Sequence, residues 1–97
     1  MLTVEIIKQA VLPLTEKYNI AKVDLFGSYA DGNATEKSDA DFLVKFNVET
    51  PSIFKVMGFK QELETILNYP VDVITMPIKR QDKLRIRNVV NVYDRAG

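Results

Sequence analysis

The sequence predicts an α/β (α+β) fold in which a small mixed β-sheet is packed against helices. Short apolar segments whose residues alternate with a period of two are interspersed with longer amphipathic segments of helical period. The chain has 97 residues, of which 46% are hydrophobic, and this is typical of one globular domain spanning residues 1–97.

The first predicted element is an amphipathic helix over residues 3–18. Its apolar residues recur at helical spacing and are Val4, Ile7, Val11 and Leu14. Pro13 lies in the same segment and cannot donate the backbone hydrogen bond to the carbonyl four residues earlier. We therefore expect the helix to kink or break at Pro13.

Two strands separated by a polar loop are predicted next. The first strand covers residues 22–26 and runs directly into Gly27. The polar residues from 29 to 38 predict a loop, with one helical turn at its start. The second strand covers residues 40–46, and its apolar residues alternate onto one face. These residues are Phe42, Val44 and Phe46.

The remaining segments predict a helix, a third strand and a final helix. Thr50 is expected as the N-cap and Pro51 as the first residue of a helix that ends at Leu67. Its predicted apolar side consists of Ile53, Val56, Met57, Leu63, Ile66 and Leu67. A strand over 71–75 follows, and a final helix is expected to begin near Lys79. The predicted buried face of that last helix consists of Ile86, Val89, Val90 and Tyr93.

The composition restricts the chemistry that the chain can carry out. Thirteen basic and thirteen acidic residues cancel, so a general nucleic-acid binder, which needs a net positive field, is not expected. Cysteine and histidine are absent, so catalysis must rest on carboxylates, hydroxyls, amines or a bound metal. No signal peptide and no apolar run of about twenty residues is visible, so membrane association is not expected and a cytoplasmic location is the default.

Two aspartates at the start of the second predicted strand are candidate metal ligands. Residues two apart in a strand point to the same face, so Asp39 and Asp41 are expected to project together, away from the apolar face. Two carboxylates a few ångströms apart repel by about 4 kcal/mol at an effective dielectric of about 20, and a bound cation would offset this repulsion. Mg²⁺ fits because it takes a few carboxylate oxygens and completes its ligands with water and phosphate.

Two further sequence features point to phosphate chemistry. Gly27 follows a strand directly and allows the backbone to approach a phosphate closely, while Ser28 adds a hydroxyl and a backbone N–H. Asp72 is an isolated acid within the apolar third strand, and on a neighbouring strand it would complete a carboxylate cluster with Asp39 and Asp41. Phosphoryl transfer assisted by two metal ions requires such a cluster.

These segments resemble the signature of the DNA polymerase β-like nucleotidyltransferase superfamily. The resemblance is carried by Gly27-Ser28-Tyr29-Ala30-Asp31-Gly32 and by Ser38-Asp39-Ala40-Asp41-Phe42-Leu43-Val44. The short chain and the segment Val71-Asp72-Val73-Ile74-Thr75 are similar to the minimal branch of this superfamily, and the likeness covers most of the chain. The resemblance implies a polymerase β-like palm fold, a triphosphate bound by Gly27 and Ser28, and metal bound by Asp39 and Asp41. It implies that Asp72 is a third metal ligand or the base for the acceptor hydroxyl.

The resemblance also implies an activity and a partner. The expected activity is Mg²⁺-dependent transfer of a nucleoside monophosphate from a nucleoside triphosphate, with ATP as the expected donor, to a hydroxyl, with release of pyrophosphate. Minimal domains of this kind often act as antitoxins beside a helical partner of the HEPN type, and some transfer AMP onto it. One acceptor that the resemblance allows is a tyrosine of such a toxin, which would make the chain a protein adenylyltransferase. The acceptor, the base preference and homo-oligomerisation are left open.

Asp31 departs from the family pattern, which commonly has arginine at this position. An acid here would repel a triphosphate unless it turned outward, and we expect both Asp31 and Asp24 to face solvent. The alternative hypothesis is a noncatalytic antitoxin, a module that binds and blocks a helical partner while its own nucleotide site is vestigial.

Overall fold

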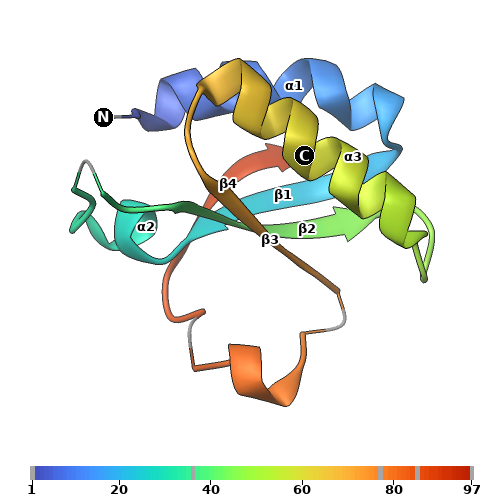
Figure 1. The fold of residues 1–97 in the computed structure, drawn as a ribbon. Helices are drawn as coiled ribbons and strands as arrows, with labels where there is room; N and C mark the ends of the chain where they lie inside the picture. The colour runs from blue at the N-terminus through green and yellow to red at the C-terminus, as the bar shows by residue number, and fades with distance from the viewer. Residues whose placement is uncertain (1, 36, 77, 85, 97) are drawn as a thin grey trace.

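The computed structural model of the chain describes residues 2–35, 37–76, 78–84 and 86–96. Its elements are α1 (Val4–Lys17), β1 (Ile20–Phe26), α2 (Ser28–Asp31), β2 (Ala40–Phe46), α3 (Ile53–Leu67), β3 (Val71–Thr75), the 3₁₀-helix η1 (Arg80–Asp82) and β4 (Val89–Asp94). Figure 1 shows α1 and α3 covering one face of the sheet, with the segment that contains η1 on the other side. Among the described residues, no helix combines the length and apolar character needed to cross a bilayer.

The sheet is mixed, which confirms the predicted fold class. Its four strands lie in the order β3-β2-β1-β4. Strand β1 is antiparallel to both of its neighbours, whereas β2 and β3 are parallel. Parallel strands cannot be joined by a tight turn, and α3 provides the crossover between β2 and β3. As a result, β2 and β3 begin at one end of the sheet and finish at the other.

Helix α1 forms much as predicted, but the expected break at Pro13 is wrong. The side chain of Thr3 caps the helix by accepting a hydrogen bond from the Ile6 N–H at 3.2 Å. The helix then continues without a break from Val4 to Lys17. Pro13 lies on the exposed face, while Val11 and Leu14 are buried on either side of it. Burial of these two side chains against the sheet holds the helix together where one backbone hydrogen bond is missing.

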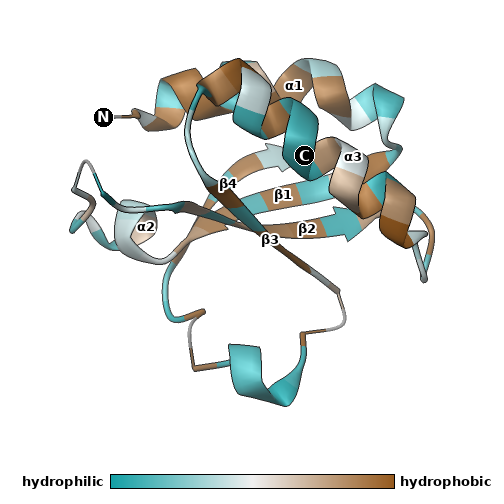
Figure 2. Cartoon of the chain, viewed as in Figure 1, coloured by the Kyte–Doolittle hydropathy of each residue, from teal (hydrophilic) through white to brown (hydrophobic). Residues whose placement is uncertain are grey.

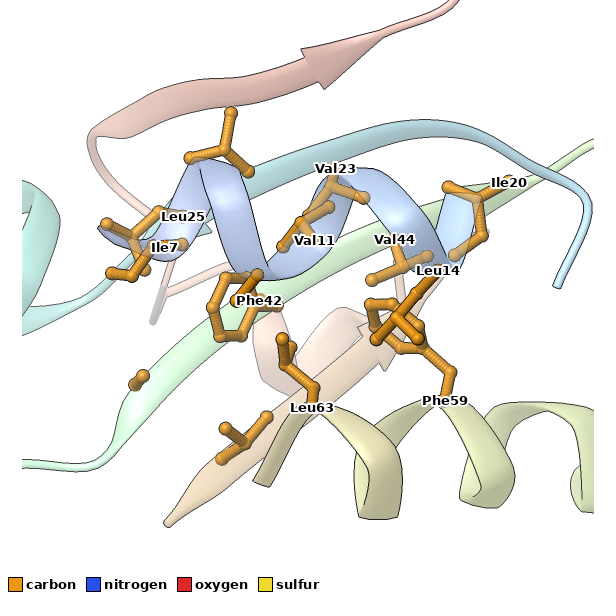
Figure 3. Close-up of a cluster of buried hydrophobic side chains, with 14 of the residues drawn as sticks. Ile7, Val11, Leu14, Ile20, Val23, Leu25, Phe42, Val44, Phe59 and Leu63 are labelled. Carbon is orange, nitrogen blue, oxygen red and sulfur yellow. The ribbon is translucent and has the colours of Figure 1, made fainter. Parts of the chain in front are cut away.

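The main hydrophobic core lies between the two long helices and the sheet (Figure 3). Ile7, Val11 and Leu14 of α1 point toward the central strands, and Phe59 and Leu63 of α3 reach the same layer. The residues that meet them from β1 and β2 alternate along each strand, as the period of two requires. These strand residues are Ile20, Val23, Leu25, Phe42 and Val44.

The predicted start of α3 is wrong, and its predicted apolar side is right only for Leu63, Leu67 and the partly buried Val56. Ser52 rather than Thr50 is the N-cap, and its hydroxyl accepts a hydrogen bond from the Lys55 N–H at 3.2 Å. The buried residues are Phe59, Leu63 and Leu67, which follow one another at spacings of one turn. Three residues predicted for the apolar side are instead exposed on the outer surface of the helix: Ile53, Met57 and Ile66.

The predicted final helix is also wrong. The chain forms only the short η1 after β3 and then the strand β4, which pairs with β1. Residue 85, which falls within the predicted helix, lies outside the described residues. The sequence of β4 is rich in β-branched residues, and Val92 is buried in the main core. Pairing with β4 gives hydrogen-bond partners to the backbone N–H and C=O groups along the edge of β1. A helix at this edge would leave those groups of β1 unpaired.

The prediction that Asp24 faces solvent is wrong as well. On the sheet face opposite the helices, Phe26, Leu43 and Ile74 form a second, smaller cluster that Ile78 and Ile86 cover. Asp24 lies on this same face and is only 5% exposed. Its carboxylate accepts a hydrogen bond from the side-chain amide of Asn91 at 2.9 Å, and the Lys22 ammonium lies 3.6 Å away.

Candidate active site

Asp41 and Asp72 occupy paired positions on neighbouring parallel strands. The register joins Ala40 to Val71 and Asp41 to Asp72. Paired residues of adjacent strands are about 4.8 Å apart and point to the same face of the sheet. Ala40 and Val71 are buried in the helix-covered core, so Asp41 and Asp72 project from the opposite face, where both are half-buried. The fold thus brings together two of the three predicted carboxylates.

The register at this end of the sheet is fixed by two hydrogen bonds. The Ala40 N–H donates to the Pro70 carbonyl at 3.0 Å, which aligns the starts of β2 and β3. The Val71 N–H donates to the Glu64 carboxylate of α3, also at 3.0 Å. Glu64 therefore positions the strand that carries Asp72. Sequence reasoning missed this role, because nothing in the local pattern distinguishes Glu64 from Glu62, the other acid of α3.

Gly27 brings the turn after β1 against the Asp41 carboxylate. Phe26 pairs with Asp41 across β1 and β2, so the next residue, Gly27, lies directly beside that acid. Gly27 has φ 74° and ψ −149°, a conformation that residues with a side chain rarely adopt. A Cβ atom at this position would overlap the Asp41 carboxylate oxygen Oδ2. Glycine is needed here both for its backbone angles and for the space that it leaves.

A single helical turn follows Gly27, as predicted. The Asp31 N–H donates to the Gly27 carbonyl at 3.0 Å and closes α2, which starts at Ser28. The Tyr29 ring packs edge-on against Tyr69 at 6.1 Å between ring centroids, and this contact ties α2 to the connection that leads into β3. Ser28, the first residue of this turn, is half-buried. Residue 36 of the predicted loop lies outside the described residues.

Asp39 is exposed and lies one residue before β2 begins. Among the described residues, no three acidic side chains lie close enough together to hold a metal ion. Asp41 and Asp72 are neighbours, but Asp39 does not join them in a cluster of three carboxylates. This arrangement still fits Mg²⁺, because Mg²⁺ commonly uses only one or two carboxylates and takes further oxygens from substrate phosphates.

Asp31 is exposed, as predicted, and its carboxylate is hydrogen-bonded to a neighbouring segment. Its carboxylate oxygen Oδ1 accepts a hydrogen bond from the side-chain amide of Asn88 at 3.0 Å. Asn88 immediately precedes β4, so this bond joins the end of α2 to the edge of the sheet. Sequence reasoning missed Asn88, since the two residues are far apart along the chain.

Among known protein families, the model for the nucleotidyltransferase domain matches residues 6–92 of the chain. MJ1215 of Methanocaldococcus jannaschii, which bears a provisional name as a protein adenylyltransferase, is 42% identical over 71 residues, or 73% of this chain and 81% of MJ1215. The protein adenylyltransferase MntA of Thermococcus cleftensis is 37% identical over 78 residues, or 76% of this chain and 78% of MntA.

Solved structures show the same fold. A structure described provisionally as a minimal nucleotidyltransferase has a TM-score of 0.73 and 29% identity, and the match covers 92% of this chain and 95% of that one. A second match, with a TM-score of 0.69 and 14% identity, covers 95% of this chain and 73% of that one. It comes from the structure of the tri-AMPylated HEPN toxin of Shewanella oneidensis in complex with an MNT antitoxin.

A mixed sheet with paired acids beside a glycine turn, matched by the family model over most of its length, defines an enzyme class. The chain belongs to the nucleotidyltransferase domain family and is a nucleotidyltransferase. Its similarity to MJ1215, MntA and the minimal nucleotidyltransferase structure sets it among the minimal members of that family.

Proposed function

We propose that this chain transfers AMP from ATP to a hydroxyl group of a protein partner, in a reaction that depends on Mg²⁺. The observation that carries this proposal is the pairing of Asp41 with Asp72 directly beside Gly27. This pairing places two acids and a glycine turn side by side at one end of the sheet. Transfer of a nucleoside monophosphate requires these parts side by side.

Each residue has a role in the proposed reaction. Gly27 and Ser28 hold the triphosphate through backbone N–H groups and the serine hydroxyl. Asp39 and Asp41 are the proposed metal ligands, with Asp72 as third ligand or as base. When bound, Mg²⁺ supplies positive charge that neutralises the triphosphate oxygens and favours ionisation of a nearby hydroxyl.

The bond changes follow from this placement. The acceptor oxygen forms a bond to the α-phosphorus of ATP as its proton passes to the Asp72 carboxylate. The bond between the α-phosphorus and the oxygen that bridges to the β-phosphate breaks, and pyrophosphate leaves with that electron pair. The product is an AMP ester of the acceptor. Because Asp72 is half-buried on the sheet face beside Asp41, it can reach an acceptor that approaches from solvent.

The proposed acceptor is a tyrosine of a helical HEPN-type toxin, which would make the chain an antitoxin. Two relatives carry protein adenylyltransferase names, and a protein of the same fold is found in complex with an AMP-modified HEPN toxin. Incubation of the chain with a purified HEPN-type protein, ATP and Mg²⁺ tests this. Intact mass should show addition of AMP, and peptide mapping should place it on tyrosine.

The nucleotide site can be tested without a partner by replacing Asp41 with asparagine. ATP with Mg²⁺ should raise the melting temperature of the wild-type chain, since a ligand that binds only the native state stabilises it. Asp41→Asn should abolish this increase while leaving unfolding in urea within about 1 kcal/mol of wild type, because it removes charge repulsion from Asp72. Glu16→Gln, on the exposed face of α1, is the matched control and should behave as wild type. An undiminished ATP effect in Asp41→Asn would refute the site.

The second candidate is the noncatalytic antitoxin, which Asp31 favours because an acid replaces the family's usual arginine. The two candidates differ in one outcome. A noncatalytic module would bind and inhibit the HEPN-type protein without adding mass to it, and its binding would be unaffected by Asp41→Asn and Asp72→Asn.

A further inference from the structure

The end of the sheet opposite the acid pair contains an apolar groove. Two adjoining hollows, of about 290 and 390 Å³, share Glu49, Pro51 and Met76. We call them together the distal groove. They lie where the parallel strands β2 and β3 finish and where α3 begins. From Asp41 to the last residue of β2 the strand rises about 17 Å, so the distal groove is separate from the proposed nucleotide site.

Apolar side chains line this groove and remain open to solvent. Val48, Ile53 and Met76 are 43%, 71% and 40% exposed. Phe54, next to Ile53, is 86% exposed. Figure 2 shows hydrophobic colouring at the start of α3, at the right-hand end of the molecule. A cluster of exposed apolar side chains around hollows is typical of an interaction surface.

The charges around the groove are mostly positive. Lys45 and Lys79 each line one of the hollows. The Lys55 ammonium lies 6.0 Å from the ring centroid of Phe46, which lines the first hollow. Glu49 is the one acid that lines either hollow among the described residues. The chain as a whole has no net charge, so this end is locally basic, while Asp31, Asp39, Asp41 and Asp72 make the opposite end acidic.

We infer that the distal groove docks an acidic segment of a protein partner, whose apolar side chains enter the hollows while its carboxylates face the lysines. Charge complementarity favours an acidic protein segment over the other molecules that could bind in the groove. A second copy of this chain docked through the same groove would bring its own lysines against these three and would be repelled. A nucleic acid would find no aromatic side chain lining either hollow except Phe46, and a polynucleotide backbone gains little from an aliphatic surface.

Selection from a library of random displayed peptides tests this inference on the full chain. Peptides are selected on the wild-type chain and counter-selected on Ile53→Gln/Met76→Gln, a double variant altered only at exposed side chains of the groove. The enriched peptides should combine apolar residues with an excess of aspartate and glutamate. Titration of the purified peptides should show about ten-fold or greater loss of affinity for the groove variant and for Lys45→Glu/Lys79→Glu.

The matched control is Leu12→Gln/Ile66→Gln, which removes two apolar side chains that are 61% and 51% exposed elsewhere on the helices. It should bind the peptides as wild type does. All variants should keep the ATP-dependent rise in melting temperature, so failure here is distinguishable from failure of the proposed transfer reaction. Enrichment of neutral or basic peptides, no enrichment, or equal binding to the groove variant would overturn the inference. So would a concentration-dependent dimer that Ile53→Gln/Met76→Gln abolishes in sedimentation, because the occupant would then be a second copy.

Discussion

Gly27 makes the approach between the glycine turn and the acid pair possible. Its positive φ and extended ψ place the backbone where a residue with a side chain would be strained, and the Asp41 carboxylate fills the space next to its Cα. Gly32, at the end of α2, also has a positive φ, of 77°, but a Cβ atom there would meet nothing within 4 Å. Substitutions at the two glycines can therefore be compared: backbone strain is expected at both positions, whereas the close approach to Asp41 exists only at Gly27.

We predict that Gly27→Ala destabilises the chain by about 2–4 kcal/mol and removes ATP binding, because it combines strain with displacement of the Asp41 carboxylate. Gly32→Ala should lose about 1 kcal/mol from backbone strain alone and keep ATP binding. Urea denaturation and isothermal titration measure the two effects. Equal ATP affinity in both variants would show that the contact between residue 27 and Asp41 does not matter for the nucleotide.

Asp31 allows a second test at the scale of one side chain. If ATP binds beside Gly27 and Ser28, replacing the acid by arginine changes the local charge by two units and supplies a forked donor suited to phosphate. Asp31→Arg should tighten ATP binding, most clearly at low salt, where charges are screened least. Asp31→Asn is the control, since it removes the charge and keeps an oxygen that can accept from Asn88. Titration at two ionic strengths compares them, and equal affinities at low salt would mean that residue 31 points away from the nucleotide.

At the scale of elements, the sequence predicted the strands that carry the site better than it predicted the end of the chain. The strands β2 and β3 have the predicted bounds, because alternation and flanking turn residues are local signals. The residues of β4 also fit a helical spacing, and what makes them a strand is the open edge of β1, which no local pattern contains. The contacts of Asp31 with Asn88 and of Glu64 with Val71 were missed for the same reason.

The candidate site was predictable to the extent that its residues lie on predicted strands. Asp39, Asp41 and Asp72 could be assigned from the sequence, but only the parallel register shows that Asp41 and Asp72 are direct neighbours while Asp39 lies outside the strand. The burial of Asp24 could not be predicted, because its partner Asn91 lies on β4, which pairs with β1 from far along the chain.

The two long helices are joined by a polar cluster whose strength should depend on pH. The Glu62 carboxylate accepts hydrogen bonds from the Lys17 ammonium and the Tyr18 hydroxyl. The bond from Lys17, followed by that from Tyr18, lowers the pKa of Glu62 from its ordinary 4.5. The bond with Glu62 raises the pKa of Lys17 above 10.5 and that of Tyr18 above 10.0.

The direction of the pH effect follows from these shifts. The contribution of Glu62 to the stability of the fold is present above pH 4.5 and is lost as pH falls through its lowered pKa. The contributions of Lys17 and Tyr18 to stability are lost as pH rises through their raised pKa values. Glu62→Gln should therefore lower the melting temperature most between about pH 5 and pH 9, and the difference from wild type should shrink outside that window. Glu16→Gln serves as control. A difference that is constant from about pH 3 to about pH 11 would contradict the assignment.

At the scale of the whole molecule, one core joins both helices to the sheet. Phe59 is fully buried and meets the rings of Tyr18 and Phe46 edge-on, at 6.0 and 6.5 Å between centroids. Phe59→Ala should reduce the free energy of unfolding by about 3–5 kcal/mol, a large part of the total of about 5–15 kcal/mol for a domain of this kind. Phe54→Ala, on the same helix but 86% exposed, should change it by less than about 0.5 kcal/mol. Urea denaturation of both variants measures this, and comparable losses would mean that α3 packs through a different face.

The parallel pairing of β2 with β3 also sets the order in which the site can appear during synthesis. Gly27, Ser28 and Asp41 leave the ribosome before α3 has formed, and Asp72 follows only after that helix has brought the chain back along the sheet. A nascent chain, or one terminated within α3, therefore has the glycine turn, Asp39 and Asp41 but lacks Asp72. In the proposed reaction such a fragment has no base for the acceptor, so activity would begin only when the crossover is complete.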